Sequence, residues 1–129
     1  MILVDTSVWI DFFGEKPLPH VNKLEALIGQ GEEIAICGVI LTEILQGIRD
    51  EKQFHETEER LNTLTFLPMI HNTFVVAAHI YRSLRIQGIT IRKSIDCMIA
   101  AAALENKAYF LHNDRDFKVI AEYFPLKVL

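Results

Sequence analysis

The sequence lacks an apolar run long enough to cross a lipid bilayer. No uninterrupted apolar stretch approaches the roughly 20 residues that a membrane-spanning helix needs. Asp5 and Asp11 interrupt the apolar N-terminal segment, and no basic region precedes it, so the segment does not resemble a signal peptide. We therefore expect a cytoplasmic protein without a membrane segment.

Cysteine and the common catalytic motifs are also scarce. The two cysteines, Cys37 and Cys97, lie in apolar surroundings without CxxC spacing, which favours buried free thiols over a disulfide or a metal pair. There is no P-loop, no GxGxxG and no GxSxG motif, and the five histidines show no paired ligand spacing. These absences argue against a nucleotide-binding loop, a serine hydrolase and a histidine metal site.

Basic residues are fewer than acidic residues in this chain. With 13 Lys and Arg residues against 17 acids, the formal net charge is −4, which argues against simple non-specific adhesion to a nucleic-acid backbone. A nuclease remains compatible with this charge, because two divalent cations in an acidic cluster would offset it. The length of 129 residues and the 50% hydrophobic content match one domain, residues 1–129, with a single core.

Apolar runs alternate along the chain with segments of helical spacing. The expected strands are Ile2–Val4, Ile34–Cys37, Phe66–Pro68 at an edge, Tyr109–His112 and Leu126–Leu129. The expected helices cover Val8–Phe13, His20–Leu27, Val39–Ile48, a solvated Asp50–Arg60, Asn72–Ile86, Asp96–Glu105 and a last one from Phe117. Such alternation favours an α/β fold with a mainly parallel sheet.

The first strand leads directly into an acid. Asp5 ends the run Ile2–Val4, and helical spacing then begins, with Thr6 or Ser7 as the expected cap. Asp5 thus lies at the carboxyl end of a strand, which is where ligands bind in open α/β sheets. Two interpretations remain open: a helix cap or a ligand-binding carboxylate.

Three further acids hold comparable positions. Glu43 falls about one turn into the helix after the second strand, and Asp114 follows the strand that begins at Tyr109. Asp96 opens a nearly all-apolar helix, where it needs a metal or a basic partner to offset desolvation, or the helix dipole alone. Because right-handed crossovers bring the carboxyl ends of parallel strands to one edge, we expect these acids to converge near Asp5.

Such a cluster has a specific chemistry. Carboxylate oxygens suit hard ions such as Mg²⁺ or Mn²⁺ rather than zinc. Two such ions can activate a water molecule and stabilise both the attacking and the leaving oxygen of a phosphodiester. The pattern therefore predicts phosphodiester hydrolysis without a covalent nucleophile.

Four segments together resemble a PIN-domain ribonuclease of the VapC toxin type. They are LVDTSVWID at Leu3–Asp11, LTEILQG at Leu41–Gly47, SIDCMIAAAALE at Ser94–Glu105 and FLHNDRDF at Phe110–Phe117. The resemblance implies a three-layer α/β/α sandwich with a four- or five-stranded sheet, and Mg²⁺- or Mn²⁺-dependent cleavage of tRNA or another structured RNA. It also implies a homodimer and neutralisation by a VapB-type antitoxin.

The resemblance also implies roles for individual residues. The catalytic acids would be Asp5, Glu43, Asp96 and Asp114, the metal ligands Asp5, Asp96, Asp114 and Asp116, and the supporting hydroxyls those of Thr6 and Ser7. Arg92 and Lys93 are candidate RNA contacts, with an ordinary basic surface as the alternative. The residue before Asp114 is Asn113, whereas many relatives have Thr or Arg nearby. The resemblance therefore leaves open the geometry of the metal site around Asp114.

Other interpretations stay open at this point. A phosphoacceptor receiver-like domain also gathers carboxylates at strand ends, although no lysine lies at the edge 113–116. A catalytically silent PIN-like module would bind RNA or an antitoxin without cleaving anything. For an antitoxin, we expect a groove among the helices within His20–Gly31 and Thr42–Leu64, suited to a partner helix.

Overall fold

Five strands form one parallel sheet in a computed structural model that describes all residues from 1 to 129. They are β1 (Ile2–Val4), β2 (Ile34–Cys37), β3 (Thr65–Leu67), β4 (Tyr109–Leu111) and β5 (Lys127–Val128). Their order is β3-β2-β1-β4-β5, and each neighbouring pair is parallel. The predicted parallel sheet is confirmed, with the predicted edge strand at β3.

Seven helices connect these strands. They are α1 (Thr6–Phe13), α2 (Pro19–Gly29), α3 (Gly38–Gln46), α4 (Glu51–Leu61), α5 (His71–Ile86), α6 (Ser94–Glu105) and α7 (Arg115–Tyr123). All seven predicted helices are present, with ends that differ by up to a few residues. Two predicted strands were too long, because His112 leaves the sheet after β4 and only Lys127–Val128 pairs near the C-terminus.

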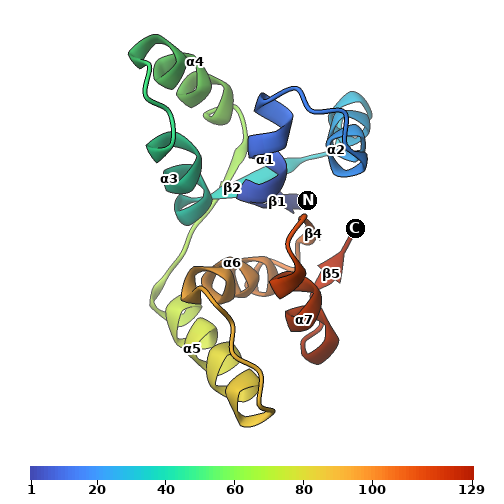
Figure 1. The fold of residues 1–129 in the computed structure, drawn as a ribbon, viewed down its shortest axis with the longest axis vertical. Helices are drawn as coiled ribbons and strands as arrows, with labels where there is room; N and C mark the ends of the chain where they lie inside the picture. Colours follow the sequence, from blue (N-terminus) through green and yellow to red (C-terminus); the bar gives the residue numbers. More distant parts are fainter.

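The path of the chain through the sheet creates two layers of helices. From β1 the chain moves outward to β2 and β3, then returns to β4 on the other side of β1. Right-handed crossovers in these two directions place their helices on opposite faces. Figure 1 shows α1 to α4 on one side of the strands and α5 to α7 on the other. The three-layer sandwich is confirmed, and the strand order reverses between β1 and β4, where ligands bind in such sheets.

The core lies between the sheet and the buried helix α6. All three residues of β1 are buried, and the run Ala100–Ala103 in α6 has no exposed surface. Small side chains there let α6 approach its neighbours closely, including α5. Cys37 and Cys97 are buried and free, as predicted. No helix is both long and apolar enough to span a membrane.

Candidate active site

Asp5 stands at the point where the strand order reverses. Its backbone N–H donates to the Leu111 carbonyl at 2.9 Å, in line with the pairing of Val4 and Leu111 in β1 and β4. Its carboxylate caps α1, because Oδ2 accepts the backbone N–H of Ser7 at 3.0 Å and the Ser7 hydroxyl at 2.6 Å. The sequence left the cap open between Asp5 and the hydroxyls of Thr6 or Ser7, and the structure shows Asp5. Asp5 is therefore both a helix cap and a buried carboxylate at the strand end.

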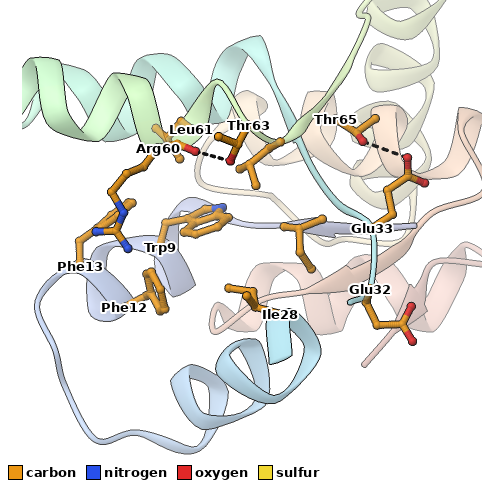
Figure 2. A pocket seen from close by; sticks show the side chains of 12 residues that line it. Trp9, Phe12, Phe13, Ile28, Glu32, Glu33, Arg60, Leu61, Thr63 and Thr65 are labelled. Carbon is orange, nitrogen blue, oxygen red and sulfur yellow. Dashed lines mark hydrogen bonds between the residues drawn. The ribbon is translucent and has the colours of Figure 1, made fainter. Parts of the chain in front are cut away.

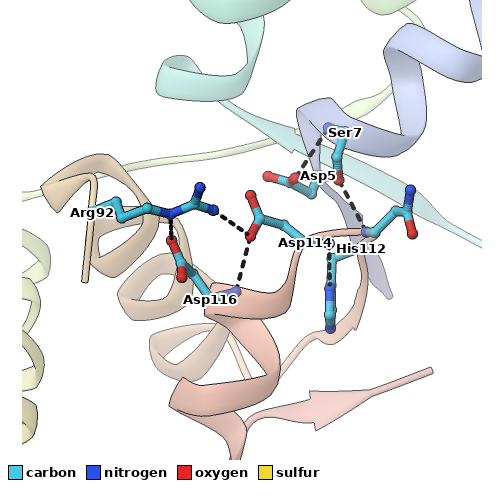
Figure 3. A network of polar contacts seen from close by, with 7 residues as sticks. Asp5, Ser7, Arg92, His112, Asp114 and Asp116 are labelled. Carbon is cyan, nitrogen blue, oxygen red and sulfur yellow. Dashed lines mark hydrogen bonds and ion pairs between the residues drawn. The ribbon is translucent and has the colours of Figure 1, made fainter. Parts of the chain in front are cut away.

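Ser7 connects the two central strands beyond their ends. Besides donating to Asp5, its Oγ accepts the backbone N–H of Asn113 at 3.0 Å (Figure 3). One hydroxyl thus orients the Asp5 carboxylate and fixes the loop that follows β4. At position 113, which the sequence had left open, the contact with the site is made by the backbone N–H.

His112 holds the same loop from the other side. Its Nδ1 accepts the backbone N–H of Asp114 at 3.1 Å, and its ring stacks on Phe110 with centroids 5.6 Å apart. Burial lowers the pKa of His112, which favours the neutral ring that this acceptor requires. Sequence reasoning missed His112, because the apolar run placed it in a strand; its position two residues before Asp114 was the available signal.

Asp114 and Asp116 open α7 beside Arg92. Asp114 Oδ1 accepts the backbone N–H of Asp116 at 2.9 Å and so caps the helix. The Arg92 Nη2 lies 3.7 Å from Asp114 Oδ1, and its Nε donates to Asp116 Oδ2 at 3.3 Å (Figure 3). Arg92, predicted as an RNA contact, thus lies on the acidic cluster, while the exposed Lys93 forms neither of these ion pairs.

Asp96 is the most isolated of the acids. It lies in the first turn of α6 and is only 4% exposed, and its Oδ2 is buried without a hydrogen-bond partner. Burial raises the pKa of Asp96 to about 7; the positive charge of Lys93 opposes this rise, and the charges of Asp114, Asp5 and Asp116 add to it. A carboxylate in this state favours a cation as its partner.

Glu43 reaches the site from α3 on the opposite helix layer. The Thr6 hydroxyl donates to Glu43 Oε1 at 2.7 Å, so α1 orients this carboxylate. Burial raises the pKa of Asp5, an effect that its hydrogen bonds from Ser7 and Thr6 oppose. The predicted supporting hydroxyls therefore act mainly on carboxylates, with Thr6 holding Glu43 and Ser7 holding Asp5.

Comparison with known proteins identifies this arrangement. The sequence matches the PIN domain family over residues 2–123. It is 41% identical over 134 residues to VapC ribonuclease Mb1587 of Mycobacterium bovis, covering 98% of this chain and 96% of the relative. This chain belongs to the VapC family of PIN-domain proteins. Ribonuclease VapC1 of Methanocaldococcus jannaschii is a more distant relative, 30% identical over 131 residues, with 98% of this chain and 85% of that protein covered.

Solved VapC structures share the fold. The structure of VapBC2 from Rickettsia felis bound to a promoter DNA fragment has a TM-score of 0.79 at 22% identity, covering 100% of this chain and 98% of that one. VapC20 of Mycobacterium tuberculosis, described as a sarcin-ricin loop cleaving toxin, has a TM-score of 0.67 at 15% identity, with 98% and 99% covered. These similarities confirm the PIN-like α/β architecture.

The oxygen atoms of this VapC site fit a divalent cation. Asp96, Asp114 and Asp116 each offer one carboxylate oxygen, and these atoms lie within 4.8 Å of one another. Three hard oxygen donors suit Mg²⁺ or Mn²⁺, and the unpartnered Asp96 Oδ2 supplies a ligand atom that no group of the chain satisfies. Asp5 lies beside this group and is close enough to affect the pKa of Asp96.

Proposed function

We propose that this VapC protein is an Mg²⁺- or Mn²⁺-dependent endoribonuclease that cleaves tRNA or another structured RNA. The observation that carries the proposal is the buried, unpartnered Oδ2 of Asp96 beside the carboxylates of Asp114 and Asp116. The relatives' names, VapC ribonuclease Mb1587 and Ribonuclease VapC1, support RNA as the substrate. We place the activity in the cytoplasm and in one domain, residues 1–129.

The acids have two roles, metal binding and proton transfer, according to their positions in the site. The residues that would hold the ion are Asp5, Asp96, Asp114 and Asp116. A bound ion of this kind supplies an activated water and stabilises negative charge on the phosphate. Glu43, held by the Thr6 hydroxyl, orients the water and accepts its proton.

The RNA backbone would meet the basic residues before α6. Arg92 and Lys93 are both exposed at the edge of the acidic cluster. A guanidinium has five N–H donors, so Arg92 can contact a phosphate while keeping its two carboxylate contacts. The chain as a whole is acidic. Arg92 and Lys93 therefore supply the local positive charge that would attract a phosphate backbone to the site.

We also propose that a VapB-type antitoxin binds a groove on the helix layer that contains α1. A cavity of about 450 Å³ lies between α1, α2 and α4, and Figure 2 shows Trp9, Phe12, Phe13 and Ile28 facing it. Arg60 lies 4.9 Å above the Phe13 ring in its wall. Complexes of VapBC proteins, including VapBC2 from Rickettsia felis, support an antitoxin as the partner.

This groove differs in one respect from the predicted one. The predicted helices α2 and α4 line it, but α3 does not, and the aromatic side chains come from α1. The prediction did not include α1, whose apolar residues had been used only to locate a helix. A basic antitoxin side chain reaching the acidic site from this groove would explain neutralisation.

For the homodimer, we propose the exposed end of α5 as the contact. Ile70, Phe74 and Val75 are 58%, 45% and 40% exposed, an unusual concentration of apolar side chains at the start of one helix. Light scattering on the purified protein should give a dimer, and Phe74→Glu should give a monomer. A wild-type monomer would contradict this assignment.

The nuclease proposal is tested by incubating purified protein with total tRNA in Mg²⁺, Mn²⁺ or EDTA and sequencing the fragment ends. The matched pair of variants is Asp5→Asn and Asp50→Asn. Both residues are aspartates that cap a helix, α1 and α4 respectively, and asparagine caps equally well. Only Asp5 lies in the site, so the pair separates chemistry from folding.

We expect discrete cuts that need the metal, disappear with Asp5→Asn and persist with Asp50→Asn. Cuts that survive in Asp5→Asn or in EDTA would indicate a contaminating nuclease and contradict the proposal. If no RNA is cut but Mn²⁺ binds and an antitoxin is captured, the chain is a silent binding module.

A further inference from the structure

The acidic site already contains one cation, and it belongs to the chain. The Arg92 guanidinium spans two carboxylates, with Nη2 3.7 Å from Asp114 Oδ1 and Nε 3.3 Å from Asp116 Oδ2. A guanidinium keeps its charge at every physiological pH, so it cannot leave these acids by losing a proton. A second cation at Asp114 and Asp116 would have to displace it.

Arg92 is also the only basic side chain in contact with Asp116. That acid is 7% exposed, and its carboxylate accepts a hydrogen bond from the Arg92 Nε. The guanidinium is tethered to the loop before α6, so it is present at a high effective concentration, which a free ion must exceed. The tether therefore favours Arg92 over a weakly bound second ion.

The other half of the site has no such cation. Asp96 Oδ2 has no partner, and the Asp5 carboxylate receives hydrogen bonds only from its neighbours Thr6 and Ser7. The cations are thus unevenly placed. Arg92 pairs with the two acids at the start of α7, whereas Lys93 acts on Asp96 by its charge without forming an ion pair. A single dication at Asp96 would complete the arrangement.

We propose that Arg92 is the built-in cation of this site, so that the chain binds one divalent ion, centred on Asp96 and its neighbours Asp5, Asp114 and Asp116, where a two-ion site would bind two. This inference rests on the proposed nuclease function and specifies its metal requirement. The Arg92 side chain is 59% exposed, so a phosphate can reach it. It supplies to a phosphate the positive charge that a second ion would otherwise supply.

The test is the number and affinity of Mn²⁺ ions bound, measured by calorimetry and by electron paramagnetic resonance of free Mn²⁺. The variants are Arg92→Gln and Lys93→Gln. Both remove one positive charge from adjacent exposed positions, but only Arg92 contacts the carboxylates. Lys93→Gln therefore measures the general effect of charge, and circular dichroism checks that each variant is folded.

We expect one Mn²⁺ per wild-type chain and per Lys93→Gln chain. Arg92→Gln should bind a second ion, or bind the first about fivefold more tightly than Lys93→Gln does, as loss of a competing ion pair at an exposed site allows. At saturating Mn²⁺, cleavage by Arg92→Gln should nevertheless fall about tenfold, because its contact with the phosphate is lost.

Other results would overturn the inference. Two Mn²⁺ ions on the wild-type chain, identical binding by the two variants, or cleavage by Arg92→Gln at the wild-type rate would each show that Arg92 does not occupy a cation position. If neither the wild type nor Arg92→Gln binds Mn²⁺, the metal-dependent function itself fails, which is a distinguishable result.

Discussion

The imidazole of His112 holds the backbone of Asp114 in place. Its Nδ1 accepts the Asp114 N–H at 3.1 Å, while the ring packs against both Phe110 and Phe117. Asp114 in turn caps α7 and contacts Arg92. The orientation of a proposed metal ligand therefore depends on a histidine outside the proposed ligand set.

Replacing this acceptor should weaken metal binding without unfolding the protein. His112→Phe keeps an aromatic ring against Phe110 and Phe117 and removes Nε2, which is buried without a partner. The variant should unfold at or above the wild-type temperature. Its Mn²⁺ affinity should fall about fivefold, the equivalent of one hydrogen bond of ~1 kcal/mol. Calorimetry and thermal unfolding measure the two effects.

The reciprocal variant is His112→Asn. An asparagine side chain can accept the N–H two residues on, so Mn²⁺ affinity should stay near the wild-type value. Its smaller volume leaves a cavity beside the Phe110 ring, so the unfolding temperature should fall. Equal Mn²⁺ affinities for the Phe and Asn variants would show that the hydrogen bond to Asp114 is unimportant.

Ser7→Ala should reduce RNA cleavage by about tenfold or more. The change removes a 2.6 Å hydrogen bond to the Asp5 carboxylate and a 3.0 Å one from Asn113, and hydrogen bonds to charged groups contribute about 1.5–3 kcal/mol. Ser7→Thr keeps the hydroxyl and is the matched control. Single-turnover cleavage at saturating metal measures the loss; a Thr variant as slow as the Ala variant would point to packing instead.

The stability of the metal-free protein should depend on the ionisation of Asp96. Its pKa rises from the usual 3.8 to about 7 in the folded chain, so the folded state holds a proton that the unfolded state has released. The free energy of unfolding should therefore fall as the pH rises from about 4 to about 7. Asp96→Asn removes this dependence and should stabilise the metal-free chain at pH 8 by on the order of 2–4 kcal/mol.

Bound metal should reverse the order of stability of the wild type and Asp96→Asn. Millimolar Mg²⁺ should raise the unfolding temperature of the wild type, since an ion that binds only the folded state stabilises it. It should have little effect on Asp96→Asn. Chemical unfolding at pH 5 and pH 8, with and without Mg²⁺, tests both statements, and a variant stabilised as much as the wild type would remove Asp96 from the metal site.

A charge in the aromatic groove should block the antitoxin and spare the nuclease. Ile28 lines the groove and is 45% exposed, whereas Ile86 at the end of α5 is 79% exposed and lies outside it. Ile28→Glu should abolish capture of a co-expressed VapB-type antitoxin, and Ile86→Glu should retain it. Both should keep their cleavage activity. Equal capture by the two variants would place the antitoxin elsewhere.

The parallel sheet and the position of its acids could be predicted from the sequence, because both follow from local patterns. A short apolar run such as Ile2–Val4 can be read without knowledge of its neighbours, and parallel strands bring their carboxyl ends to one edge. That was enough to predict that Asp5, Glu43 and Asp114 lie at that edge. The helix cap was left open between Asp5 and the hydroxyls of Thr6 or Ser7, and the structure shows Asp5, because periodicity locates a helix end only to within a residue or two.

Only the tertiary structure decided how these acids are held. Ser7 and Asn113 are 106 residues apart in sequence, and Arg92 meets Asp116 across a separation of 24. Periodicity shows which face of a helix or strand is buried, but not which polar atom of another element it meets. The sequence by itself determined that carboxylates gather at one edge of a parallel sheet. The packing of α1, α6 and the loop after β4 decided which of them have a partner, because hydrogen bonds depend on distances that only the folded chain sets.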